Sequence, residues 1–361
     1  MNPARLLVLP ALVGLCFSVT AAAQDDYTLH DYANECAELI MDAPVFNCLD
    51  LDIVPITVNG EVPEEYTSQM SCDRPAMLPY PDYTDGQCAP YTRFSAFEDG
   101  DVQLVQFCRR MYIRDENDPR FDSIEMIMHN VKTGSTCFFI SKNFGENPDG
   151  ELGTRVPPPT ELEPPEGELA AADLWATPQQ VADHGCIYCH DSDPWMRTPW
   201  IAQNGELPAD PWGFHSVDAG GPFVDWPKPE SIATRGNTCV GCHRIGSLNT
   251  CQEMEIPTFG DQPAKMMQSV GQAPHGRLGA RPGTIEEYPP DVYSDWAQSY
   301  PHAYWMPPGN VLPLTEWNKI YEHDIAELQR CCADHDAPGC FVEPITSKER
   351  WLELMESGET G

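Results

Sequence analysis

Two short segments of the chain share a pattern of cysteine and histidine residues that can do chemistry. Each has two cysteines three positions apart and a histidine directly after the second one. Thiols at this spacing can form thioethers with the two vinyl groups of one haem, and the adjacent imidazole then faces the iron. We therefore expect two haem c groups, with the two histidines as iron ligands. The residues are Cys186, Cys189 and His190 in the first motif and Cys239, Cys242 and His243 in the second.

Two other chemistries use paired cysteines. A zinc ribbon would also need four thiolates, but its two pairs usually lie much closer together in the sequence than these do. A thioredoxin-like redox motif does not require a histidine after both pairs. Covalent haem attachment is therefore the interpretation that accounts for all six residues.

The first residues have the features of an export signal. Arg5 and the α-amino group are positive, residues 6–19 are apolar, and Ala21–Ala23 offers a cleavage site, so residues 1–23 are interpreted as a signal peptide. Cys16 follows Leu15 rather than a small residue, which argues against a lipoprotein. No later segment is long and apolar enough to span a membrane. The mature protein is expected in the periplasm or outside the cell.

The cysteine content of 15 fits an oxidising compartment. Ten cysteines lie outside the signal and the two motifs. The six before residue 150 predict three disulfides, and the four after residue 250 predict two, without fixing the connectivity. Cys108 and Cys137 fall in neighbouring predicted strands and could be bridged. The two groups are Cys36, Cys48, Cys72, Cys88, Cys108 and Cys137, and Cys251, Cys331, Cys332 and Cys340.

Residues 24–150 are predicted to form a disulfide-rich, mainly-β domain. Residues 102–113 are rich in strand formers, residues 123–130 alternate in polarity, and a turn at 130–135 precedes a third strand at 136–141. The pattern is typical of a β-meander. His129 in this region is interpreted as a packed or surface residue rather than a ligand.

Residues 151–168 are rich in proline and glutamate and predict an extended, semi-rigid linker. We expect the rest, 169–361, to be a dihaem cytochrome c domain. All nine tryptophans of the chain lie in it and could line a haem. Before the first motif, Thr177-Pro178 is an N-cap followed by a proline at the first helical position. Residues 229–234 indicate a similar but weaker helix before the second motif.

The second motif and the residues after it resemble class I cytochrome c. Tyr304-Trp305-Met306-Pro307-Pro308-Gly309 is similar to the loop that supplies the methionine ligand in that family, and residues 314–330 have the pattern of the amphipathic helix that follows. The resemblance implies that His243 and Met306 bind the second iron. It also implies a mainly-α fold for 169–361, so the whole chain is expected to be an α+β multidomain protein.

The sequence offers several candidates for the second ligand of the first haem. His215 is the first candidate because it lies in a loop 25 residues downstream of His190. Dihaem cytochrome c peroxidases are similar in haem number but place their motifs in separate domains, for which the spacing here is too short. The chain as a whole resembles a secreted dihaem type of protein. The alternatives to His215 are His275, His302 and Met196.

The net charge of the chain limits the kinds of partner that it can bind. The formal net charge is −35, from 56 acidic and 21 basic residues, which excludes ordinary nucleic-acid binding. The acidic residues are spread along the chain, as on a solvated surface, and would also steer a basic redox partner.

The leading functional hypothesis is electron transfer through the two haems. One alternative is a haem enzyme acting on peroxide or another small substrate at the first haem, with Arg197, His184 or Tyr188 near the iron. Another is an assembly or binding protein in which the haems serve as a relay.

Overall fold

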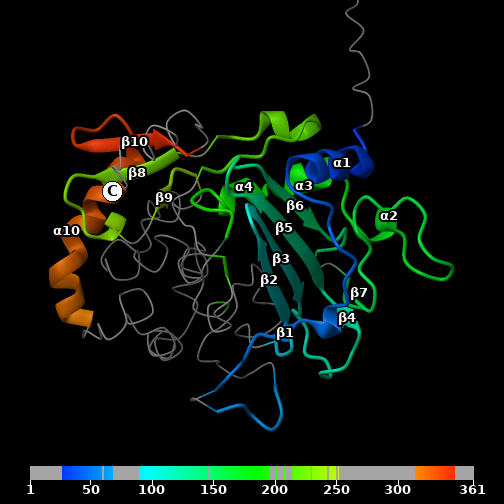
Figure 1. Ribbon diagram of the computed structural model, residues 1–361. Helices are drawn as coiled ribbons and strands as arrows, with labels where there is room; N and C mark the ends of the chain where they lie inside the picture. The colour runs from blue at the N-terminus through cyan, green and yellow to red at the C-terminus, as the bar shows by residue number, and fades with distance from the viewer. Residues whose placement is uncertain are drawn as a thin grey trace, which may run out of the picture.

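A five-stranded antiparallel sheet forms the centre of the computed structural model (Figure 1). The spatial order is β1-β2-β3-β5-β6, so four of the strands follow one another as the predicted meander. The predicted strands at 102–113, 123–130 and 136–141 are confirmed as β3, β5 and β6. The bounds are β1 (Asp52–Ile53), β2 (Arg93–Asp99), β3 (Val102–Arg109), β5 (Ser123–Asn130) and β6 (Thr136–Ile140).

The structure describes only part of the chain. The described residues are 27–58, 61–67, 89–144, 147–195, 201, 207–208, 214–228, 230–241, 244–248, 251 and 314–345. The predicted signal peptide lies outside them, as do Cys72 and Cys88. No helix within these ranges has the length and apolarity needed to cross a membrane.

Short helices and two small sheets surround the central sheet. The helices are α1 (Leu29–Leu39), η1 (Cys48–Asp50), α2 (Ala171–Leu174), α3 (Pro178–His184), α4 (Cys186–Cys189), η3 (Gly221–Asp225), η4 (Cys239–Gly241) and α10 (Leu314–Ala333). One small sheet pairs β4 (Arg120–Phe121) with β7 (Glu151–Leu152). The other has the order β10-β8-β9, from β8 (Glu230–Thr234), β9 (Ile245–Gly246) and β10 (Cys340–Pro344).

The predicted mainly-α cytochrome domain is wrong. Helices make up only 24% of the described residues. Residues 169–361, which were expected to be mainly helical, contain the β10-β8-β9 sheet, against which α10 packs at the side of the molecule opposite α2 (Figure 1). Residues 230–234, expected to be helical, form the central strand of that sheet because they pair with Cys340–Pro344, far away in the sequence. The predicted helix at 314–330 is confirmed as α10.

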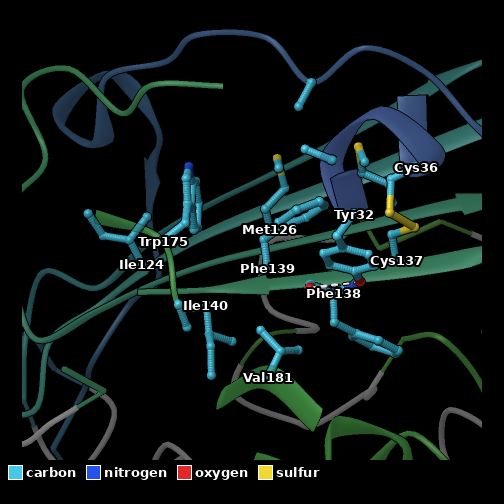
Figure 2. Packing of buried hydrophobic residues seen from close by; sticks show 14 of the residues in the cluster. Tyr32, Cys36, Ile124, Met126, Cys137, Phe138, Phe139, Ile140, Trp175 and Val181 are labelled. Carbon is cyan, nitrogen blue, oxygen red and sulfur yellow. Dashed lines mark hydrogen bonds between the residues drawn. A yellow bond between two sulfur atoms is a disulfide. The ribbon is translucent and has the colours of Figure 1, made fainter. Parts of the chain in front are cut away.

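The central sheet is buried on both faces. On one face, Met126, Met128 and Phe139 pack against α1 and Trp175 (Figure 2). On the other face, Val105 and Phe107 belong to a second cluster that includes Trp195 and Ile201. Residues from both sides of the predicted 151–168 linker therefore share these clusters. That segment is itself attached, since Val156 pairs with Phe46 and the Trp175 indole donates to the Pro157 carbonyl at 2.8 Å. The division into domains at these boundaries stays a prediction.

The outer edge of β6 is where the second half of the chain joins the sheet. Four of the backbone groups on this edge have partners from outside the sheet. The Thr136 amide donates to the Ser216 carbonyl at 2.8 Å, and the Ala176 amide donates to the Ile140 carbonyl at 2.9 Å. Between them, the Tyr32 hydroxyl donates to the Phe138 carbonyl at 3.1 Å and accepts from the Phe138 amide at 2.9 Å (Figure 2). An edge strand that would otherwise expose its hydrogen-bonding groups is thus covered.

Within the described residues, four disulfides connect the eight cysteines that lie there outside the motifs. The proposed Cys108–Cys137 bridge is wrong, because β5 lies between their strands. Both cysteines instead bond to the N-terminal segment that covers the sheet. The two disulfides predicted after residue 250 are confirmed. The pairs are Cys36–Cys137, Cys48–Cys108, Cys251–Cys332 and Cys331–Cys340.

The Tyr32 hydroxyl gives a direct test of the β6 edge. We expect Tyr32→Phe to lower the free energy of unfolding by about 2–6 kcal/mol, because two buried backbone groups lose their partner at about 1–3 kcal/mol each. Chemical denaturation measures this difference. Tyr66→Phe is the matched control, since it removes one half-buried hydrogen bond, to the Ile56 carbonyl, and should cost about 1 kcal/mol. Equal losses in the two variants would contradict the assignment.

Candidate functional site

The first motif begins directly after a well-defined helix end. The predicted capping is confirmed: the Thr177 side chain accepts from the Gln180 amide, and the Gln180 side chain accepts from the Thr177 amide. The helix ends at Gly185, whose φ of 71° and ψ of 48° are left-handed and whose amide donates to the Val181 carbonyl. A single turn, α4, follows and places Cys186 in the core cluster of the sheet.

His190 is oriented by a backbone carbonyl. Its Nδ1 lies 2.8 Å from the Pro194 oxygen, and a carbonyl can only accept, so Nδ1 holds the proton. In the neutral ring the lone pair is then on Nε2. A carbonyl bonded to one nitrogen is the usual way that a protein fixes the tautomer and direction of a metal-binding histidine. The His190 ring also contacts Phe138 of β6, with 5.2 Å between ring centroids.

His215, the first candidate for the opposite ligand, lies in the same region. It is fully buried, and neither ring nitrogen has a hydrogen-bond partner within the described residues. Burial lowers the pKa of His215 well below its usual range, so the ring is neutral. The positive charge of Arg244 lowers this pKa further, and His129 and His190 act in the same direction when they are protonated.

The central sheet positions His215. Ser216 forms a parallel bridge with Ser135 at the start of β6, and its amide donates to the Gly134 carbonyl at 2.8 Å. The Phe214 ring fills the space beside Gly134, where an added Cβ would lie 2.0 Å from a ring carbon. The φ of Gly134, +76°, also favours glycine. The residues on both sides of His215 are therefore fixed to the turn before β6.

One face of the sheet also contributes His129 and Phe138 to this region. His129 is 4% exposed, and its Nδ1 lies 2.9 Å from the Thr136 hydroxyl. Its ring contacts Trp195 edge-on, and the Trp195 indole donates to the Gln103 side chain at 3.0 Å. This burial agrees with the interpretation of His129 as a packed residue. The sequence does not predict that His129 lies near the first motif, because no local pattern shows which face of the sheet that motif covers.

The second motif is anchored to α10. The Thr238 amide donates to the Asp324 carboxylate at 2.9 Å, and the Asn237 side chain donates to the Asp324 carbonyl at 2.7 Å. The Asn237 side chain also accepts from the Cys239 amide at 3.0 Å. Cys239 is buried and begins η4. These contacts fix the entry to the second motif against a helix far along the chain.

Several predicted site residues lie outside the described residues. They are Cys242, His243, Met306, Met196, Arg197, His275 and His302, together with the side chain of Cys189. The two described candidates for a catalytic role near the first haem, His184 and Tyr188, are both exposed. Within the described ranges, no three His, Cys, Asp or Glu side chains gather as a metal-ion site.

The buried imidazole of His129 predicts a pH dependence of stability. Burial, helped by nearby Arg244, lowers the His129 pKa to about 4. The unfolded state takes up a proton near pH 6.5, while the folded state does not until about pH 4. His129 should therefore cost up to about 3 kcal/mol of stability as the pH falls between these values. Denaturation at several pH values should show that His129→Asn lacks this loss.

The matched control for this prediction is His323→Asn, which removes an imidazole that is 80% exposed. This variant should follow the wild-type pH dependence. A parallel pH dependence in wild type and His129→Asn would contradict the prediction.

Comparison of the chain with known protein families, curated proteins and solved structures finds no match.

Proposed function

We propose that the protein binds two haem c groups covalently and transfers electrons through them, in the periplasm or outside the cell. The observation that most supports this is the buried side chain of His215. Its two ring nitrogens lack hydrogen-bond partners among the described residues, and it is close enough to His190 for the two rings to interact electrostatically. Burying polar atoms without partners is costly, so their presence indicates a ligand. Iron is such a ligand for a neutral imidazole.

The residues around the first motif fit a haem. His190, through Nε2, and His215 would be the two histidines that hold the haem iron. Pro194 would keep the His190 ring oriented through its hydrogen bond to Nδ1. Phe138 contacts that ring, and Trp226 contacts Phe138 with 6.1 Å between ring centroids, which provides an aromatic surrounding that excludes water. A bound haem would supply one-electron chemistry at iron.

The second haem would be attached through Cys239 and Cys242, with His243 and Met306 as iron ligands. The fixed entry to this motif, through Asn237 and α10, supports a preorganised attachment segment. A methionine ligand raises the reduction potential relative to a second histidine. Unequal ligation would therefore direct electrons from the first haem to the second.

An acidic chain of this charge would select a basic redox protein as its partner. Opposite charges raise the rate of encounter between transient partners, and this effect weakens with ionic strength. The partner would thus be recognised by charge rather than by a large apolar interface.

The first test is a haem count. The mature protein, produced in a host that attaches haem c, should have the mass of the chain plus two haem groups. Cys186→Ala combined with Cys189→Ala should have the mass of one haem fewer. Cys36→Ala combined with Cys137→Ala removes a disulfide and should keep both haems in the folded fraction. A wild-type protein without added haem mass would contradict the proposal.

The second test concerns the iron ligand at the first haem. Optical and electron paramagnetic resonance spectra of the oxidised wild type should show low-spin iron only. His215→Ala should convert one of the two haems to a high-spin form and keep the mass of both, because the thioethers do not depend on His215. His184→Ala, at an exposed histidine one turn before the motif, should keep the wild-type spectra.

Two outcomes would redirect the assignment. Unchanged spectra in His215→Ala would exclude His215 as the ligand. A high-spin haem in the wild type would instead favour the enzyme alternative, with an open iron position at that haem.

A further inference from the structure

The residues that follow the two motifs lie against each other. Ser192, two residues after His190, accepts two hydrogen bonds from the segment after His243. The Arg244 Nε donates to its carbonyl at 2.5 Å, and the Gly246 amide donates to its hydroxyl at 3.0 Å. The two motifs, well separated in the sequence, are therefore joined at their C-terminal ends by direct contacts.

Buried carboxylates strengthen this junction. Asp191 is fully buried and accepts from the Leu248 amide at 2.8 Å. Asp193 is also buried, and its carboxylate lies 3.7 Å from the Arg244 guanidinium. Buried carboxylates are rare unless they are paired or hydrogen-bonded, because the loss of water costs several kcal/mol per ion. These acids are therefore held in the interior by the segment at 244–248.

The Asp191 side chain lies too close to Gly246 for any side chain at that position. A Cβ added to Gly246 would lie 2.4 Å from the Asp191 carboxyl carbon. Contacts below 3.0 Å are not tolerated, and both the buried Asp191 and the strand that contains Gly246 are fixed. The glycine is thus required by the distance between the two segments.

The same turn orients His190. Arg244 contacts Ser192 and Asp193, and the Asp193 side chain accepts from the Trp195 amide at 2.9 Å. Pro194 lies between Asp193 and Trp195, and its carbonyl accepts from His190 Nδ1. We propose that Arg244, which follows the second motif, is a positioning residue for the haem site at His190. This inference rests on the proposed function.

The physical consequence concerns the first iron. A hydrogen bond at Nδ1 makes the opposite nitrogen a stronger donor to a metal, which lowers the reduction potential. When the turn at 191–195 loosens, that bond lengthens and the potential rises. Arg244 thereby makes the properties of one haem depend on the segment attached to the other.

Arg244→Lys is the informative variant, because it keeps the charge and removes the guanidinium geometry. Two quantities are measured on the full chain: amide hydrogen exchange of residues 190–195, and the reduction potential of each haem. We expect faster exchange across 190–195 and an upward shift of the potential of the His190 haem. Arg235→Lys, at an exposed arginine before the second motif, should change neither quantity.

Exchange in 190–195 at the wild-type rate in folded Arg244→Lys would overturn the proposal. If that variant does not fold, Ser192→Ala replaces it, since it removes the acceptor of the Gly246 amide and, with it, a hydrogen bond to the neighbouring Asp191 carboxylate. Faster exchange of Gly246 and of residues 190–195 would then support the proposal, and faster exchange of Gly246 alone would overturn it. The exchange measurement does not require haem. A negative exchange result therefore contradicts the role of Arg244, whereas a failed haem count contradicts the proposed function.

Discussion

The hydrogen bonds at the outer edge of β6 are the interaction on which the rest of the structure depends. A strand at the end of a sheet has backbone groups that must be paired or exposed. Here Ser216, Tyr32 and Ala176 supply partners for three alternate positions of that edge. Each belongs to a different segment, so one strand holds the N-terminal helix, the segment before the first motif and the segment after it.

The candidate site follows from this constraint. His215 precedes Ser216, so its position is set by the turn at the start of β6. Phe138, in the middle of the same strand, contacts His190. The disulfide-rich part of the chain is therefore a structural part of the candidate site at the first motif.

Local structure was predictable where its cause is local. Thr177 and Pro178 define a helix start by capping and a fixed φ, and residues 123–130 show strand alternation within eight positions. Residues 230–234 form a strand and not the expected helix, because their structure depends on pairing with 340–344. The predicted Cys108–Cys137 bridge is wrong because no local pattern shows that β5 lies between the strands of these two cysteines. His215 was a candidate from sequence, but its closeness to His190 depends on a bridge between Ser135 and Ser216.

The attachment of Ser216 to the β6 edge has a consequence for how the protein is assembled. Thioether formation at Cys186 and Cys189 needs only a short stretch of chain, whereas His215 reaches its place when the sheet, including Cys137 of the Cys36–Cys137 disulfide, has formed. If haem is bound as proposed, attachment and coordination are separate events in maturation. An oxidative folding defect in the N-terminal half would then yield a protein with its haem in place and the iron bound by one histidine.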